Sequence, residues 1–182
     1  RGACFEKVVH AVLSVPDRTL PFNARALGNS PPLEQVTLRC SRARPILTVA
    51  DLKKLDPGDY GIGRGGFPAV DGVLKHSDGS VDLLHMTVSP VHGMKHNALK
   101  SIVEALGDTV RRILWIVPST RFATFPAQTF RVSGSGKVYT RPSPTLLAIP
   151  QYVVLFPNDD GLLVGAAGMQ DWLRQDELKP EV

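Results

Sequence analysis

The chain has 182 residues, of which 43% are apolar and 21% are charged. This composition suits one folded domain and excludes a low-complexity or disordered chain. No apolar run approaches the roughly 20 residues of a membrane-spanning helix, so a membrane protein is not expected. The net charge of +4 permits attraction to polyanions such as nucleic acid without requiring it.

The chain begins without a Met, and we expect a single domain over residues 1–182 that has been excised from a longer protein. We expect its core over residues 2–157 and a docking helix near residues 168–179. The two cysteines, Cys4 and Cys40, lack the spacing of a metal site. A reduced, intracellular environment is therefore the simpler interpretation.

Apolar residues recur at helical spacing over Ala3–Val15, which predicts an amphipathic helix that Pro16 ends. Glu6 lies on the first turn of this helix, where a carboxylate suits the helix dipole. This capping role is its simplest interpretation. His10 is expected to face solvent.

Short strands are predicted at Leu20–Leu27 and Gln35–Cys40. Arg42–Pro45 is expected to form a basic loop, and Thr48–Asp51 has the spacing of a helix-starting capping box. The glycine-dense segment Tyr60–Gly66 precedes a predicted strand, whereas a phosphate-binding loop precedes a helix. We therefore expect a flexible loop there.

The centre of the chain is predicted to be a β-hairpin. Phe67–Lys75 and Val81–Ser89 are expected strands, and Asp78-Gly79 between them is a strong turn signal. Asp71 lies within the first strand. An ionisable side chain inside a strand needs a partner, an ion or a chemical role. We favour a site role for Asp71 over the alternative that it satisfies a turn or a basic side chain.

The second strand of the hairpin alternates, with His85 and Thr87 on one face and Asp82 on the opposite, exposed face. Taken alone, His85 is more often a core histidine that bonds to the backbone than a metal ligand. Thr87 is a good strand former and needs no function to explain its presence.

The next segment, His92–Leu106, is predicted to be a helix with His92 and His96 on its sheet-facing side. Continuous apolar runs at Arg112–Pro118 and Gln151–Pro157 predict strands that are covered on both faces. A strand, a helix and a buried strand in this order predict a parallel βαβ unit.

These elements bring several polar groups to one strand edge. Asp71 is expected beside the strand of His85, with Glu6 reaching the same edge, which is a layout that suits a divalent metal. His92 and His96 have the spacing of a helical zinc pair but lack a clear third ligand. A zinc hydrolase that uses them with His85 is the third-ranked hypothesis.

Basic residues cluster modestly along the chain. A nucleic-acid-binding face and scattered solvated charge explain this clustering about equally well. The residues assigned to such a face are Arg39, Arg42, Arg44, Arg111 and Arg112.

The motif order resembles the C-terminal nuclease-like domains of Crinkler effectors and the related retrotransposon hot spot proteins of trypanosomes. The shared order is RGxxFE on an opening helix, FPAVDGVL, VDLLHMTVSPVH, a helix, and ILWIVPS followed by an FxxF stretch. These domains are similar to the PD-(D/E)XK restriction-endonuclease-like superfamily. The resemblance implies an α/β, three-layer fold in which helices flank a central mixed sheet.

The resemblance also implies a candidate catalytic site. Glu6 matches the first-helix carboxylate, and Asp71 matches the strand aspartate. His85 and Thr87 stand where the superfamily has a carboxylate and a lysine, and Lys95 is the candidate replacement for that lysine. Glu6, Asp71 and His85 would then hold Mg²⁺ or Mn²⁺.

The implied function is that of a nuclease-like effector domain that binds nucleic acid, with DNA expected. The carboxylate and the lysine of the superfamily motif are both missing from this chain. Nucleic-acid binding is therefore the stronger expectation, and metal-dependent cleavage is the weaker one. The alternative is a non-catalytic effector module that binds a host protein and perturbs host cell death or immunity. The resemblance further implies secretion into a host cell and a nuclear location there.

Overall fold

The computed structural model describes residues 2–64, 66–133 and 135–157, so the helix expected near residues 168–179 lies outside the described residues. The helical segments are α1 (Gly2–Leu13), the 3₁₀ segment η1 (Val49–Lys54), α2 (His96–Leu106), the 3₁₀ segment η2 (Gly107–Thr109), α3 (Ser119–Phe122) and α4 (Pro144–Leu147). The strands are β1 (Thr19–Leu27), β2 (Gln35–Arg39), β3 (Arg42–Ile46), β4 (Asp59–Gly63), β5 (Gly72–Lys75), β6 (Val81–Met86), β7 (Met94–Lys95), β8 (Val110–Pro118), β9 (Phe130–Arg131) and β10 (Gln151–Phe156).

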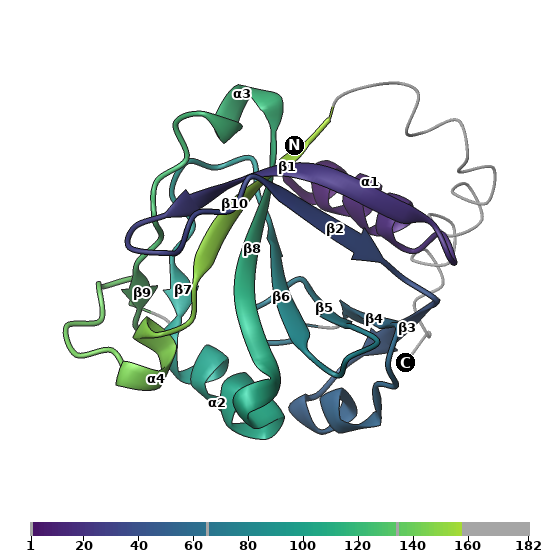
Figure 1. Ribbon diagram of the computed structural model, residues 1–182. Helices are drawn as coiled ribbons and strands as arrows, with labels where there is room; N and C mark the ends of the chain where they lie inside the picture. Colours follow the sequence, from purple (N-terminus) through teal and green to yellow (C-terminus); the bar gives the residue numbers. More distant parts are fainter. Residues whose placement is uncertain (1, 65, 134, 158–182) are drawn as a thin grey trace, which may run out of the picture.

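Eight of these strands form one curled, mixed sheet (Figure 1). Their order across the sheet is β2-β1-β10-β8-β6-β5-β4-β3, and β7 and β9 form a separate two-stranded sheet. The neighbours β6 and β8 run parallel, as do β8 and β10, while β4, β5 and β6 form an antiparallel meander. The coarse prediction of an α/β fold with a mixed sheet is confirmed.

Each face of the central strands packs into a hydrophobic cluster of its own. On one face, α1 buries Val9 and Val12 in the same cluster as Leu84 of β6. On the other face, α2 buries Leu99 in a cluster that contains Trp115 of β8. Strands covered on both faces lose the alternation of buried and exposed residues, and β6 is buried at every position.

The hairpin and the βαβ unit form as predicted. Gly79 takes a positive φ of 83° in the turn, and Lys75 then pairs with Val81 in antiparallel register. The crossover from β6 to β8 runs through α2, which ends at Gly107 with a φ of 62°. Glycine adopts this left-handed backbone at low cost, so the helix stops there.

Four predicted elements are wrong because contacts distant in sequence decide them. The glycine-dense segment Tyr60–Gly66, expected as a flexible loop, contains most of strand β4, which pairs with β3 and β5. The segment expected as a basic loop is strand β3, which pairs in parallel with β4. The strand expected from Phe67 begins only at Gly72, after a turn in which Ala69 has a φ of 70°. The helix expected from His92 begins at His96, since Met94–Lys95 pairs instead with β9.

Within the described residues, no helix is both long and apolar enough to span a membrane.

Candidate functional site

Asp71 lies just before β5, where its carboxylate meets the end of β6. The Asp71 backbone N–H donates to the Leu84 carbonyl at 2.9 Å. The Met86 backbone N–H in turn donates to Asp71 Oδ2 at 2.6 Å. The side chain therefore continues the ladder between the two strands, and this bond fixes its orientation.

Glu6 of α1 lies close enough to Asp71 for their charges to interact. Burial raises the pKa of Asp71 to about 7, the hydrogen bond from Met86 opposes this shift, and the charge of Glu6 adds to it. The pKa of Glu6 is lowered, first by its close contact with His10 and then, against the effect of burial, by the charges of His10, His92 and Arg64. We call Glu6 and Asp71 the carboxylate pair; their environments push their pKa values in opposite directions.

His10 is buried, which corrects the expectation that it faces solvent. It is 3% exposed, its Nδ1 lies 2.6 Å from the Tyr60 hydroxyl oxygen, and its Nε2 lies 3.6 Å from Glu6 Oε1. The prediction failed because the partner, Tyr60 of β4, is 50 residues away in sequence. Burial raises the pKa of Tyr60 well above its ordinary value, so this phenol keeps its proton.

His85 belongs to the core and not to the carboxylate pair. It is 2% exposed and stacks on Trp115, with ring centroids 4.3 Å apart. Burial lowers its pKa to about 3, and the neighbouring charge of His92 adds to this, so the ring is neutral. By strand alternation it faces the α2 side of the sheet, whereas Glu6 comes from the helix on the other side.

Thr87, which the resemblance places at the position of the superfamily lysine, is also buried. Its hydroxyl oxygen accepts a hydrogen bond from the Ser89 backbone N–H at 3.0 Å. This bond shapes the loop after β6, and the side chain brings no charge to the site. Lys95 is exposed on β7, and its charge helps to lower the pKa of His92 after the larger effect of burial.

The three histidines of the zinc hypothesis do not come together. His92 lies in a loop with its ring centroid 5.7 Å from that of His85. His96 lies apart, stacked at 3.8 Å on Tyr139, and its Nε2 accepts the Ser143 backbone N–H at 3.2 Å. Both ring nitrogens of His96 have protein partners, which excludes it as a third zinc ligand in this conformation.

The carboxylate pair offers oxygen donors, the ligand type that hard cations such as Mg²⁺ prefer. Within residues 2–64, 66–133 and 135–157, no group of three or more His, Cys, Asp or Glu side chains is placed to hold a metal ion. The expected set of Glu6, Asp71 and His85 is therefore not assembled. The carboxylate pair remains, and Mg²⁺ is commonly held by one or two carboxylates together with water and substrate phosphate.

Asp82 was expected to be exposed, but its exposed fraction is 0%. Burial alone would raise its pKa, but hydrogen bonds from His76, Arg111 and Arg112 outweigh it and lower the pKa to about 2. Both arginines bind the carboxylate through two nitrogens each, at 2.9–3.1 Å. Strand β6 is covered on both faces, so its even-numbered residues, Asp82 among them, are buried as well. The prediction that Asp82 is exposed assumed that only one face of the strand is covered, and it is wrong.

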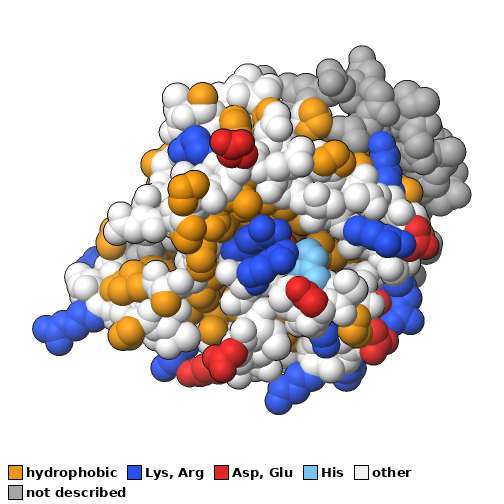
Figure 2. All heavy atoms as spheres, viewed as in Figure 1, with side chains coloured by type: hydrophobic (Ala, Val, Ile, Leu, Met, Phe, Trp, Pro, Cys, Tyr) orange, Lys and Arg blue, Asp and Glu red, His pale blue; other side chains and the backbone are white. Residues whose placement is uncertain are grey.

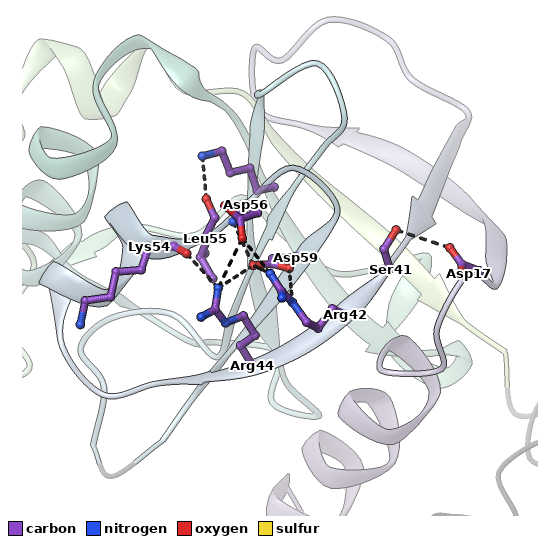
Figure 3. A network of polar contacts seen from close by, with 9 residues as sticks. Asp17, Ser41, Arg42, Arg44, Lys54, Leu55, Asp56 and Asp59 are labelled. Carbon is purple, nitrogen blue, oxygen red and sulfur yellow. Dashed lines mark hydrogen bonds and ion pairs between the residues drawn. The ribbon is translucent and has the colours of Figure 1, made fainter.

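The arginines of the β3 region form a second charge network (Figure 3). Arg42 Nε donates to Asp59 Oδ1 at 3.0 Å, and Arg44 Nη1 donates to Asp59 Oδ2 at 3.1 Å. Arg42 also pairs with the exposed Asp56 at 2.8 Å. Asp59 is buried, so these bonds compensate its charge and tie the edge strand β3 to β4.

All five arginines that were assigned to a nucleic-acid face therefore pair with carboxylates of the same chain. The fifth, Arg39, lies 3.1 Å from the exposed Asp17. Figure 2 shows the same mixture on one face of the molecule, where Lys and Arg side chains are dispersed and lie near Asp and Glu. On that face, hydrophobic side chains form broader patches than basic ones.

His10 and Tyr60 were not predicted to be site residues. His10 contacts Glu6 directly, and Tyr60 contacts Glu6 only through His10. His10 lies one helical turn after Glu6, a spacing that places the two side chains on the same helix face, so a signal was present. Tyr60 has no local signal, since only the fold brings it to His10. Gln128, also unassigned, holds the His92 loop, because its Oε1 accepts the His92 backbone N–H at 2.7 Å.

Comparison with known proteins adds no family to this geometry: no protein-family model, no curated protein and no solved structure matches the chain significantly.

Proposed function

We propose that the chain is a nuclease-like domain that binds nucleic acid, with DNA as the expected substrate, at the carboxylate pair. The observation that carries this proposal is the placement of Asp71. It lies directly before β5, the middle strand of the β4–β5–β6 meander, bonds to the end of β6 and interacts with Glu6. A half-buried carboxylate with a raised pKa beside a second carboxylate is typical of functional sites.

The order of elements supports the same proposal. The resemblance requires a helix with a carboxylate, a strand with Asp71, a strand with His85, a helix and a buried strand. The chain provides α1, β5, β6, α2 and β8 in that order, with β6 and β8 adjacent and parallel. We accordingly propose that the fold is restriction-endonuclease-like.

Glu6 and Asp71 are the residues that would hold Mg²⁺ or Mn²⁺. When bound, such an ion neutralises charge on the phosphate and lowers the pKa of a water molecule that it coordinates. It would also relieve the repulsion between the two carboxylates. His85 is not part of this set, because a buried neutral imidazole suits a hard cation poorly.

Cations near the site would contact the phosphate backbone. Arg64 interacts electrostatically with Glu6, and Lys95 lies close enough to His92 to interact with it. Because Thr87 brings no charge, we assign to Lys95 the part of the missing lysine, which is to stabilise charge on the phosphate. Lys95 lies on the two-residue strand β7, so cleavage is expected to be slow compared with that of nucleases that retain the lysine.

The direct test compares wild type with Asp71→Asn and the control Asp78→Asn on supercoiled plasmid and on single-stranded oligonucleotides, with Mg²⁺ or Mn²⁺. Asn keeps an oxygen that can accept the Met86 N–H, so the fold is preserved. Asp78 is an exposed carboxylate of the β5–β6 turn. We expect metal-dependent nicking that Asp71→Asn reduces at least about tenfold and Asp78→Asn leaves unchanged. No cleavage by wild type with either metal would refute the catalytic part of the proposal.

One observation favours the alternative, a non-catalytic module that binds a host protein. The five arginines assigned to a nucleic-acid face pair with carboxylates of the same chain, and such pairs contribute little to attraction of a polyanion. Fluorescence anisotropy with labelled DNA separates the two functions. Binding that weakens steeply with salt supports a nucleic-acid partner, whereas no DNA binding at low salt supports the alternative.

A further inference from the structure

We infer that His10 and Tyr60 form a positioning pair that holds Glu6 opposite Asp71. This inference rests on the proposed function of the carboxylate pair and names the residues that set its geometry. Neither residue would contact substrate. Both would act through Glu6, whose side chain is partly exposed, whereas His10 and Tyr60 are buried.

The first contacts link Glu6 to Tyr60 through His10. His10 Nε2 lies 3.6 Å from Glu6 Oε1, which is within ion-pair range but beyond hydrogen-bond distance. On the other side of the ring, Nδ1 is hydrogen-bonded to the Tyr60 hydroxyl across 2.6 Å. Tyr60 therefore holds the His10 ring, and this ring lies against Glu6.

The second contact ties Tyr60 to the strand of Asp71. Tyr60 is 1% exposed, and its ring lies against Gly72, the residue after Asp71. A Cβ on Gly72 would lie 2.8 Å from Tyr60 Cε2 and 2.9 Å from its hydroxyl oxygen, closer than such atoms approach. The absence of a side chain at Gly72 therefore lets the phenol reach both β5 and α1.

These contacts join two segments that are 65 residues apart in the chain, the helix of Glu6 and the start of β5. Apolar contacts also hold α1 on the sheet, and the bond between His10 and Tyr60 adds a polar link between α1 and β4 one helical turn from Glu6. Residues that support a metal ligand from behind fix its orientation, and their removal weakens metal affinity about 10- to 100-fold.

The test measures Mn²⁺ affinity by electron paramagnetic resonance on the protein without nucleic acid. Tyr60→Phe removes the hydroxyl and keeps the ring in the core, and Tyr152→Phe is the matched control in the same hydrophobic cluster. We expect Tyr60→Phe to weaken Mn²⁺ binding about tenfold and Tyr152→Phe to leave it unchanged. Equal affinity of wild type and Tyr60→Phe would overturn the inference.

A double-mutant cycle separates positioning from a general structural role. If His10 acts through Glu6, His10→Ala weakens Mn²⁺ binding in the wild-type background but has no further effect in Glu6→Gln. An equal fold-change in both backgrounds would overturn the inference. Wild type that binds no Mn²⁺, by contrast, would overturn the proposed metal site itself, so failures of the two proposals are distinguishable.

Discussion

Replacement of Asp71 by Asn should stabilise the protein at alkaline pH, because the wild-type carboxylate is held where its charge is unfavourable. Burial and the charge of Glu6 raise the pKa of Asp71 from 3.8 to about 7. Each pKa unit corresponds to about 1.4 kcal/mol. Full ionisation in the folded state thus costs at most about 4 kcal/mol, which the neutral amide avoids.

The sign of the pH dependence follows from proton linkage. A raised folded-state pKa means that the folded protein binds more protons than the unfolded chain between about pH 4 and pH 7. The contribution of Asp71 to the free energy of unfolding of the wild type therefore falls as the pH rises from about 4 to about 7. The advantage of Asp71→Asn should be below about 1 kcal/mol at pH 4 and should approach its maximum at about pH 8.

The assay is urea denaturation of both proteins at these two pH values, in buffer with a chelator. The difference between the variants cancels the titration of other groups that they share. Asp78→Asn is the control, since hydrogen bonds with Ser80 lower the pKa of Asp78 and its substitution should give no gain at high pH. An equal effect of Asp71→Asn at both pH values would refute the electrostatic reasoning.

Three further substitutions test other parts of the structure. Asp82→Ala should lower the free energy of unfolding by about 1–3 kcal/mol, measured by urea denaturation, because it removes the buried carboxylate that accepts hydrogen bonds from Arg111, Arg112 and His76. A loss below about 1 kcal/mol would contradict the network. Gly72→Ala should cost about 1–3 kcal/mol in the same assay, since its methyl group overlaps Tyr60, and a neutral effect would show that the ring moves freely. His85→Gln should lower the melting temperature through loss of stacking on Trp115 but leave Mn²⁺ affinity unchanged, and weakened Mn²⁺ binding would restore His85 as a ligand.

Local sequence patterns predicted much of the fold. The helix α1, the β5–β6 hairpin and the parallel crossover from β6 to β8 follow from apolar spacing, from Asp78-Gly79 and from element order. Each of these signals lies within a short stretch of chain, where periodicity and turn chemistry act. Asp71 was singled out as one polar residue in an apolar context, and its role at the site stays a prediction.

The errors concern residues whose partners are distant in sequence. Asp82 is buried because Arg111 and Arg112 come to it from β8, and His10 is buried because Tyr60 comes to it from β4. The N-terminal part of the predicted helix at His92 is instead a strand, because β9 pairs with it. Residue spacing along one segment carries no information on which remote segment will supply a counter-charge or a hydrogen bond.

Crystals soaked with Mn²⁺ test the central claim most directly, because the anomalous signal of manganese locates the ion independently of activity. The account predicts a peak between the carboxylates of Glu6 and Asp71 that is absent from Asp71→Asn crystals, with no peak at His85. A peak elsewhere, or none at the carboxylate pair at saturating Mn²⁺, would contradict it.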